Sequence, residues 1–120
     1  MARILVVDDE ADVLEYSCEL LRALGHEVEA VSSAERALLR LHRHTFDLVL
    51  TDFSLPGLNG VELARVVKKQ APTTLVGIVS GWESPDQKEA VEQEVDFVLP
   101  KPFTLKDLQR VVEAQLKRRE

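Results

Sequence analysis

Four apolar runs in the sequence each end on residues that could do phosphoryl chemistry. The pair Asp8 and Asp9 follows the first run, Asp52 the second, Ser80 the third and Lys101 the fourth. Carboxylates bind divalent cations, and a hydroxyl and an ammonium can hold the oxygens of a transferring phosphoryl group. This chemistry requires a fold that brings the four run ends together.

Each of these residues also has a plainer interpretation when it is taken singly. An Asp-Asp pair such as Asp8 and Asp9 is more often a solvated turn or a helix cap than a metal site. Asp52 precedes Leu-Pro-Gly, which is turn chemistry. Lys101 alone would be a surface lysine, and Ser80 alone a local hydrogen-bonding residue. Their joint placement at four strand ends favours a common site.

Strand-like and helix-like segments alternate five times with short connections, which is typical of a parallel α/β sheet. The expected strands are 3–8, 27–31, 47–52, 75–80 and 95–100. The expected helices are 11–24, 33–43, 60–70, 84–94 and 104–118. Capping boxes are expected at Ser32–Glu35, Ser84–Gln87 and Thr104–Asp107.

The first, third and fourth strands are almost wholly apolar, as central parallel strands buried on both faces are. The segments 27–31 and 95–100 alternate, as edge strands do. With right-handed crossovers this predicts a doubly wound five-stranded parallel sheet in the order 2-1-3-4-5 with five helices. Its switch point lies between the first and third strands, where Asp8, Asp9 and Asp52 would meet.

A crowded set of carboxylates needs a cation, and an oxygen-ligand site that must stay open to a substrate suits Mg²⁺. Asp9 and Asp52 are the expected direct ligands, Asp8 acts partly through water, and a backbone carbonyl near Ser54 completes the shell. Mn²⁺ is the expected substitute.

Asp52 is the expected nucleophile, because its strand is central and flanked by those that carry the acidic pair and the hydroxyl. Lys101 supplies a second counter-charge, and the Ser80 hydroxyl supplies a hydrogen bond to the phosphoryl group.

Composition limits the class of protein. A chain of 120 residues and 13.5 kDa suits a single domain over residues 1–120. Its formal net charge of −6 argues against direct nucleic-acid binding. No apolar run approaches the ~20 residues that span a bilayer, the N-terminus enters a strand directly, and Cys18 has no partner for a disulfide. A cytoplasmic protein without membrane insertion is expected.

Other residues that could do chemistry receive structural interpretations. Glu10 is expected only to complement the dipole of the first helix. Cys18 shares a helix face with Leu14 and Leu21 and is expected in the core. The three histidines lack metal-ligand spacing with any cysteine and are expected at the surface.

These residues together resemble the receiver domain of bacterial two-component response regulators over essentially the whole chain. The matching motifs are Ile4-Leu5-Val6-Val7-Asp8-Asp9-Glu10, Asp52-x-x-x-Pro56-x-x-x-Gly60, Val79-Ser80-Gly81 and Leu99-Pro100-Lys101-Pro102-Phe103. The resemblance implies a flavodoxin-like (CheY-like) fold and Mg²⁺-dependent phosphoryl transfer to Asp52 from a histidine kinase or a histidine phosphotransfer domain. It also implies a cis peptide before Pro102, a downstream protein effector, and catalysis limited to the domain's own phosphorylation and dephosphorylation.

The chain departs from the family pattern at the expected switch residues. Family members usually have an aromatic residue three positions before the lysine, where this chain has Val98. Phe97 comes one position earlier and should face the other side of the strand. The two positions that tune phosphoryl lifetime in the family are Ser54 and Trp82, and Trp82 is expected either to shield the acyl phosphate or to contact a partner. Ser80, Val98 and Trp82 are therefore the expected switch residues.

Three rival classes remain to be compared. A flavin electron carrier would have a phosphate loop rich in Gly, Ser and Thr after the first strand, and an aspartyl phosphatase would show Asp-x-Asp and a longer chain. A pseudo-receiver, which binds partners without phosphorylation, would normally have lost Asp52, the acidic pair or Lys101.

A dimer through the face formed by the fourth helix, fifth strand and fifth helix is a further expectation. The chain would be either a stand-alone regulator or a domain of a larger protein.

Overall fold

The computed structural model describes residues 1–82 and 84–119 and contains one parallel sheet in the predicted order β2-β1-β3-β4-β5. The strands are β1 (Arg3–Val7), β2 (Glu27–Val31), β3 (Leu48–Asp52), β4 (Leu75–Ser80) and β5 (Phe97–Pro100). The helices are α1 (Ala11–Ala23), α2 (Ala34–Arg43), α3 (Gly60–Gln70), α4 (Pro85–Glu92) and α5 (Leu105–Arg119). Within the described residues, no helix is long and apolar enough to cross a membrane.

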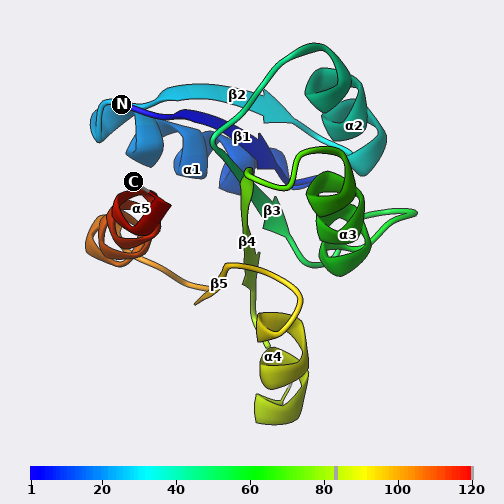
Figure 1. Ribbon diagram of the computed structural model, residues 1–120. Helices are drawn as coiled ribbons and strands as arrows, with labels where there is room; N and C mark the ends of the chain where they lie inside the picture. Colours follow the sequence, from blue (N-terminus) through cyan, green and yellow to red (C-terminus); the bar gives the residue numbers. More distant parts are fainter. Residues whose placement is uncertain (83, 120) are drawn as a thin grey trace.

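The helices cover both faces of the sheet. Figure 1 shows α1 and α5 together on one face and α2 and α3 on the other, with α4 beside β5. Successive residues of a strand point to opposite faces, so Ile4 and Val6 of β1 pack toward α1 and α5, whereas Leu5 and Val7 pack toward α2 and α3. Burial of both faces explains the nearly continuous apolar runs of the central strands.

The expected core position of Cys18 is confirmed. Its side chain is buried in the same cluster as Leu21, with Leu14 packed against that cluster. The thiol therefore belongs to the packing of α1 against the sheet.

Several element boundaries differ from the prediction by one or two residues, and two of these differences have a visible cause. The N-cap of α2 is Ser33, whose hydroxyl accepts a hydrogen bond from the Arg36 N–H at 3.2 Å, so the predicted capping box at Ser32 is wrong. The fifth strand begins at Phe97 rather than at residue 95. Asp96 accounts for this later start. Its carboxylate accepts a hydrogen bond from the Val76 N–H at 2.8 Å and forms an ion pair with Lys68 at 2.6 Å. The Asp96 side chain therefore holds the chain at the entry to β5, together with the hydrogen bond that the Asp96 N–H donates to the Val76 carbonyl at 2.9 Å.

The start of α3 lies against the end of β3. A capping box of Asn59 and Glu62 begins the helix, and the Gly60 N–H donates to the Phe53 carbonyl at 2.7 Å. A Cβ on Gly60 would lie 2.7 Å from the carbonyl oxygen of Asp52, which is closer than real Cβ atoms come. Only glycine permits this approach, and it fixes the loop that follows Asp52.

Candidate functional site

The carboxyl ends of β1, β3 and β4 bring three buried polar side chains to the same edge of the sheet. Asp8, Asp52 and Ser80 are 4%, 6% and 9% exposed. Buried carboxylates are rare unless they are paired or bind a cation. The convergence expected from the sequence is therefore present for these residues.

Lys101 reaches the same place from the end of β5. Its Nζ atom lies 3.3 Å from Oδ1 of Asp52 and 3.7 Å from Oδ2 of Asp8. The lysine backbone N–H donates to the Ser80 carbonyl at 3.0 Å, which ties the β5–α5 loop to the end of β4. The peptide bond between Lys101 and Pro102 is cis, as the resemblance implies.

The environment of Asp8 disfavours the charge of its carboxyl group. Burial raises the pKa of Asp8, and the neighbouring carboxylates of Asp52 and Glu10 add to that effect. The Glu10 N–H, which donates to Asp8 Oδ1 at 2.9 Å, and the Lys101 ammonium lower the pKa again without cancelling the rise. A divalent cation would relieve this unfavourable charge, so the site fits one.

The third carboxylate of the cluster comes from a residue that the sequence interpretation assigned only to the helix dipole. Carboxylate oxygens of Asp8, Glu10 and Asp52 lie within 4.8 Å of one another and could together hold a metal ion. Glu10 is the N-cap residue of α1. The sequence could have indicated Glu10, because it is a third acidic residue directly after the pair Asp8 and Asp9.

Two predicted metal ligands, Asp9 and Ser54, lie outside the cluster of carboxylates. Asp9 is exposed and does not belong to that cluster, and Ser54 is exposed in the loop after β3. Their ligand roles stay predictions.

The expected switch residues lie on the loops and the strand beside the site. Trp82, two residues after Ser80, packs its indole against the ring of Phe53, the residue next to Asp52. Val98 is half-buried and pairs with Ile78 of β4. Phe53 was not singled out from the sequence, because only the contact between two loops gives it a role.

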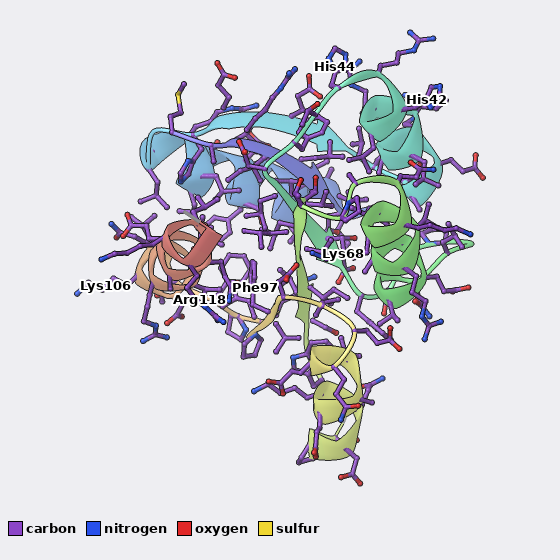
Figure 2. The ribbon with its side chains drawn as sticks, in the orientation of Figure 1. His42, His44, Lys68, Phe97, Lys106 and Arg118 are labelled. Carbon is purple, nitrogen blue, oxygen red and sulfur yellow. The ribbon has the colours of Figure 1, made fainter. Side chains whose placement is uncertain are left out.

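Phe97 faces away from Val98, as expected. It is buried with Leu108 and Val112 of α5, and Figure 2 shows its side chain next to that helix. Its ring fills the space over Gly77, its neighbour on β4, where a Cβ would overlap the ring. This aromatic side chain is therefore part of the core on the α5 face.

A groove of about 490 Å³ adjoins the site between α1 and the β5–α5 loop. It is lined by Val13, Tyr16, Lys101, Pro102 and Phe103. The Tyr16 hydroxyl donates to the Phe103 carbonyl at 3.4 Å, which links the two walls. The lysine of the site thus also borders an open, mainly apolar surface.

The histidines lie away from this edge of the sheet. His42 and His44 are at the end of α2, as Figure 2 shows, and His26 accepts a hydrogen bond from the Ala2 N–H at 3.1 Å. His42 is exposed as expected, whereas His26 and His44 are half-buried.

The fold, the acidic edge and the paired lysine define a class of signalling domain. The family model for the response regulator receiver domain matches residues 4–113, and the chain belongs to this family. The receiver domains of two-component response regulators are therefore its relatives.

Two curated relatives and one solved structure illustrate the similarity. The DNA-binding response regulator MtrA of Mycobacterium leprae is 34% identical over 116 residues, covering 97% of this chain and 52% of MtrA. The two-component response regulator PhoP of Pseudomonas aeruginosa is 33% identical over 119 residues, covering 97% of this chain and 52% of PhoP. The chain thus spans about half the length of these relatives. A receiver domain protein from Clostridium thermocellum has a TM-score of 0.88 and 32% identity, covering 98% of this chain and 96% of that structure.

Proposed function

We propose that this receiver domain accepts a phosphoryl group on Asp52 in a Mg²⁺-dependent reaction. The observation that carries the proposal is the 3.3 Å contact between the Lys101 ammonium and the buried Asp52 carboxylate, beside two further carboxylates. Asp52 supplies the attacking oxygen, and Lys101 can follow the negative charge that arrives on the phosphoryl oxygens. Mg²⁺ supplies the second counter-charge on those oxygens.

The residues that would hold Mg²⁺ are Asp8 and Asp52 of the cluster, with Asp9 and the Ser54 carbonyl as further predicted ligands. Asp8 and Asp52 offer hard oxygen ligands in a buried place, which is the chemistry that Mg²⁺ prefers. Mn²⁺ is expected to replace it.

The donor is a phosphorylated histidine of a histidine kinase or a histidine phosphotransfer domain. The bond between Asp52 and phosphorus forms while the bond between phosphorus and the donor imidazole nitrogen breaks, and the leaving imidazole takes a proton from solvent. Attack of water on the phosphorus later returns the carboxylate and releases inorganic phosphate. Support for this class of donor comes from the relative PhoP, which is a two-component response regulator.

The output is a conformational signal to a downstream protein, and the domain's catalysis is limited to its own phosphorylation and dephosphorylation. The Ser80 hydroxyl is the group that would turn toward the phosphoryl oxygens, because Ser80 ends the strand next to that of Asp52. A net charge of −6 makes direct nucleic-acid binding by this domain unfavourable.

The alternative of a phosphorylation-independent interaction module gains no support. Asp8, Asp9, Asp52 and Lys101 are all present, and three of them are in mutual contact or in the same cluster. Loss of one of these residues is what such a module would usually show.

A dimer through α4, β5 and α5 stays a prediction with some support from charge. The described part of α4 carries exposed acids such as Asp86 and Glu89, whereas α5 carries exposed bases such as Lys106 and Arg110. Two copies related by a two-fold axis could pair these opposite charges. Sedimentation with and without a phosphoryl mimic measures this directly.

Intact mass after incubation with Mg²⁺ and acetyl phosphate tests the proposed function. The wild type should gain the mass of one phosphoryl group, and Asp52→Asn should not. Asp12→Asn, which removes an exposed acid of α1, is the matched control and should be labelled normally. Labelling of Asp52→Asn at the wild-type level would overturn the proposal.

A further inference from the structure

The Glu10 side chain has an unusual combination of position and partners. Glu10 is the N-cap residue of α1, yet its side chain makes no capping hydrogen bond. Within residues 1–82 and 84–119 its carboxylate also makes no hydrogen bond or ion pair. It lies instead with the carboxylates of Asp8 and Asp52.

The charge around Glu10 is not balanced by the protein. The Lys101 ammonium contacts Asp52 and Asp8 but has no ion pair with Glu10. Three carboxylates against one ammonium leave a surplus of two negative charges in the cluster when all are ionised. One divalent cation neutralises that surplus.

Neighbouring acids differ from Glu10. Asp9, Glu10 and Asp12 are all exposed, but of these three acids only Glu10 places a carboxylate oxygen in the cluster with Asp8 and Asp52. The Glu10 N–H also donates to Asp8 Oδ1 at 2.9 Å. Backbone and side chain of Glu10 therefore both face the carboxylates that would hold the cation.

We propose that Glu10 contributes a carboxylate to the cation site of this receiver domain and so raises its affinity for Mg²⁺. The inference rests on the proposed function for the identity of the cation. The backbone of Glu10 orients Asp8, and its carboxylate adds one negative charge at the place where the cation binds. Ligand charge count is a principal determinant of the affinity of such sites.

Calorimetric titration of the full chain with Mg²⁺, without any phosphodonor, tests the proposal. Glu10→Gln should weaken Mg²⁺ binding by about tenfold or more, the range seen when groups that support a metal site are removed. Asp12→Asn removes the same charge from the same helix end and should change the dissociation constant by less than about twofold. Equal effects of the two variants would overturn the proposal, because Glu10 would then act only through the general field of α1.

A second variant separates contact from charge. Glu10→Asp keeps the charge but shortens the side chain by one methylene, so it should lose a large part of the affinity that Glu10→Gln loses. Raising the salt concentration to about 0.5 M screens exposed charges, and the difference between wild type and Glu10→Gln should persist there. Wild-type affinity in Glu10→Asp, or loss of the difference at high salt, would contradict a direct contribution.

Two measurements keep this test apart from that of the proposed function. Thermal unfolding in EDTA should show that Glu10→Gln is folded. Intact mass of the wild type and of Asp12→Asn after incubation with Mg²⁺ and acetyl phosphate measures phosphorylation separately from cation binding, and both proteins should gain one phosphoryl group. A wild type that binds Mg²⁺ but is never phosphorylated would overturn the proposed function while leaving the role of Glu10 in place.

Discussion

The indole of Trp82 packs against the ring of Phe53, with 5.8 Å between the ring centroids and 58° between the ring planes. This contact joins the loop after β4 to the loop after β3, and the two residues follow Ser80 and Asp52 closely in the sequence. The indole N–H is buried and, among the described residues, finds no hydrogen-bond partner. An unpaired buried donor costs about 1–3 kcal/mol, so a partner for this N–H in a second conformation would offset part of the cost of moving the loop.

We therefore predict that a phosphoryl mimic added with Mg²⁺ changes Trp82 fluorescence. Trp82 is the sole tryptophan, so the signal reports this loop alone. Ser80→Ala should lose most of the change, because the hydroxyl that links the phosphoryl group to the loop is missing, yet it should still bind Mg²⁺. A typical coupling between such sites is about 1–3 kcal/mol. An unchanged wild-type spectrum despite proven phosphorylation of Asp52 would show that this loop does not move.

Lys101→Ala should separate cation binding from phosphoryl transfer. The ammonium contacts the nucleophile, so its loss should slow phosphorylation by acetyl phosphate by about 10²–10³-fold, as loss of a transition-state donor does. Mg²⁺ binding should be retained or tightened, because a positive charge leaves the acidic cluster. Calorimetry and the rate of mass gain measure the two effects. If both were unchanged, Lys101 would have no role in the reaction.

Asp8→Asn should stabilise the metal-free protein at neutral pH. Folding raises the pKa of Asp8, mainly through burial, so the native state binds its proton more tightly than the unfolded chain. The stabilising effect of that proton is present below the ordinary pKa of 3.8 and is lost as the pH rises through the raised value. Removing the charge should add about 0.5–2 kcal/mol of stability at pH 7 in EDTA.

The dependence on pH and metal checks the origin of this stabilisation. The melting-temperature difference between Asp8→Asn and wild type should shrink as the pH is lowered toward 4, and it should shrink or reverse in saturating Mg²⁺. A difference that is independent of both conditions would contradict a charge effect.

Gly77→Ala should destabilise the fold through Phe97. The added methyl group would overlap the Phe97 ring, and overpacking of this kind costs about 1–3 kcal/mol. Phe97→Leu in the same chain should recover part of that loss, because the smaller side chain leaves room over residue 77. Urea unfolding of both single variants and the double variant measures the coupling, and additive effects would contradict the contact.

Much of the fold could be predicted because its signals are local. Continuous apolar runs marked β1, β3 and β4 as central strands, and the alternating segments marked β2 and β5 as edges. The parallel topology then places the strand ends at one edge, so the meeting of Asp8, Asp52, Ser80 and Lys101 followed from their positions in the chain. The receiver motifs also indicated the family, and the match of the family model to residues 4–113 confirms it.

Only the tertiary structure decided which loop side chains belong to the carboxylate cluster and which pack beside it. The carboxylate of Glu10 lies with those of Asp8 and Asp52, whereas Asp9 is not in the cluster, because side-chain direction in a loop depends on its backbone angles rather than on residue type. Phe97 lies over Gly77, and Trp82 meets Phe53, through contacts between segments that are distant in sequence. Composition and periodicity determine which elements form and in what order, since those depend on neighbours along the chain. The partners of each side chain at the site depend on packing across the sheet and between loops, which no local pattern encodes.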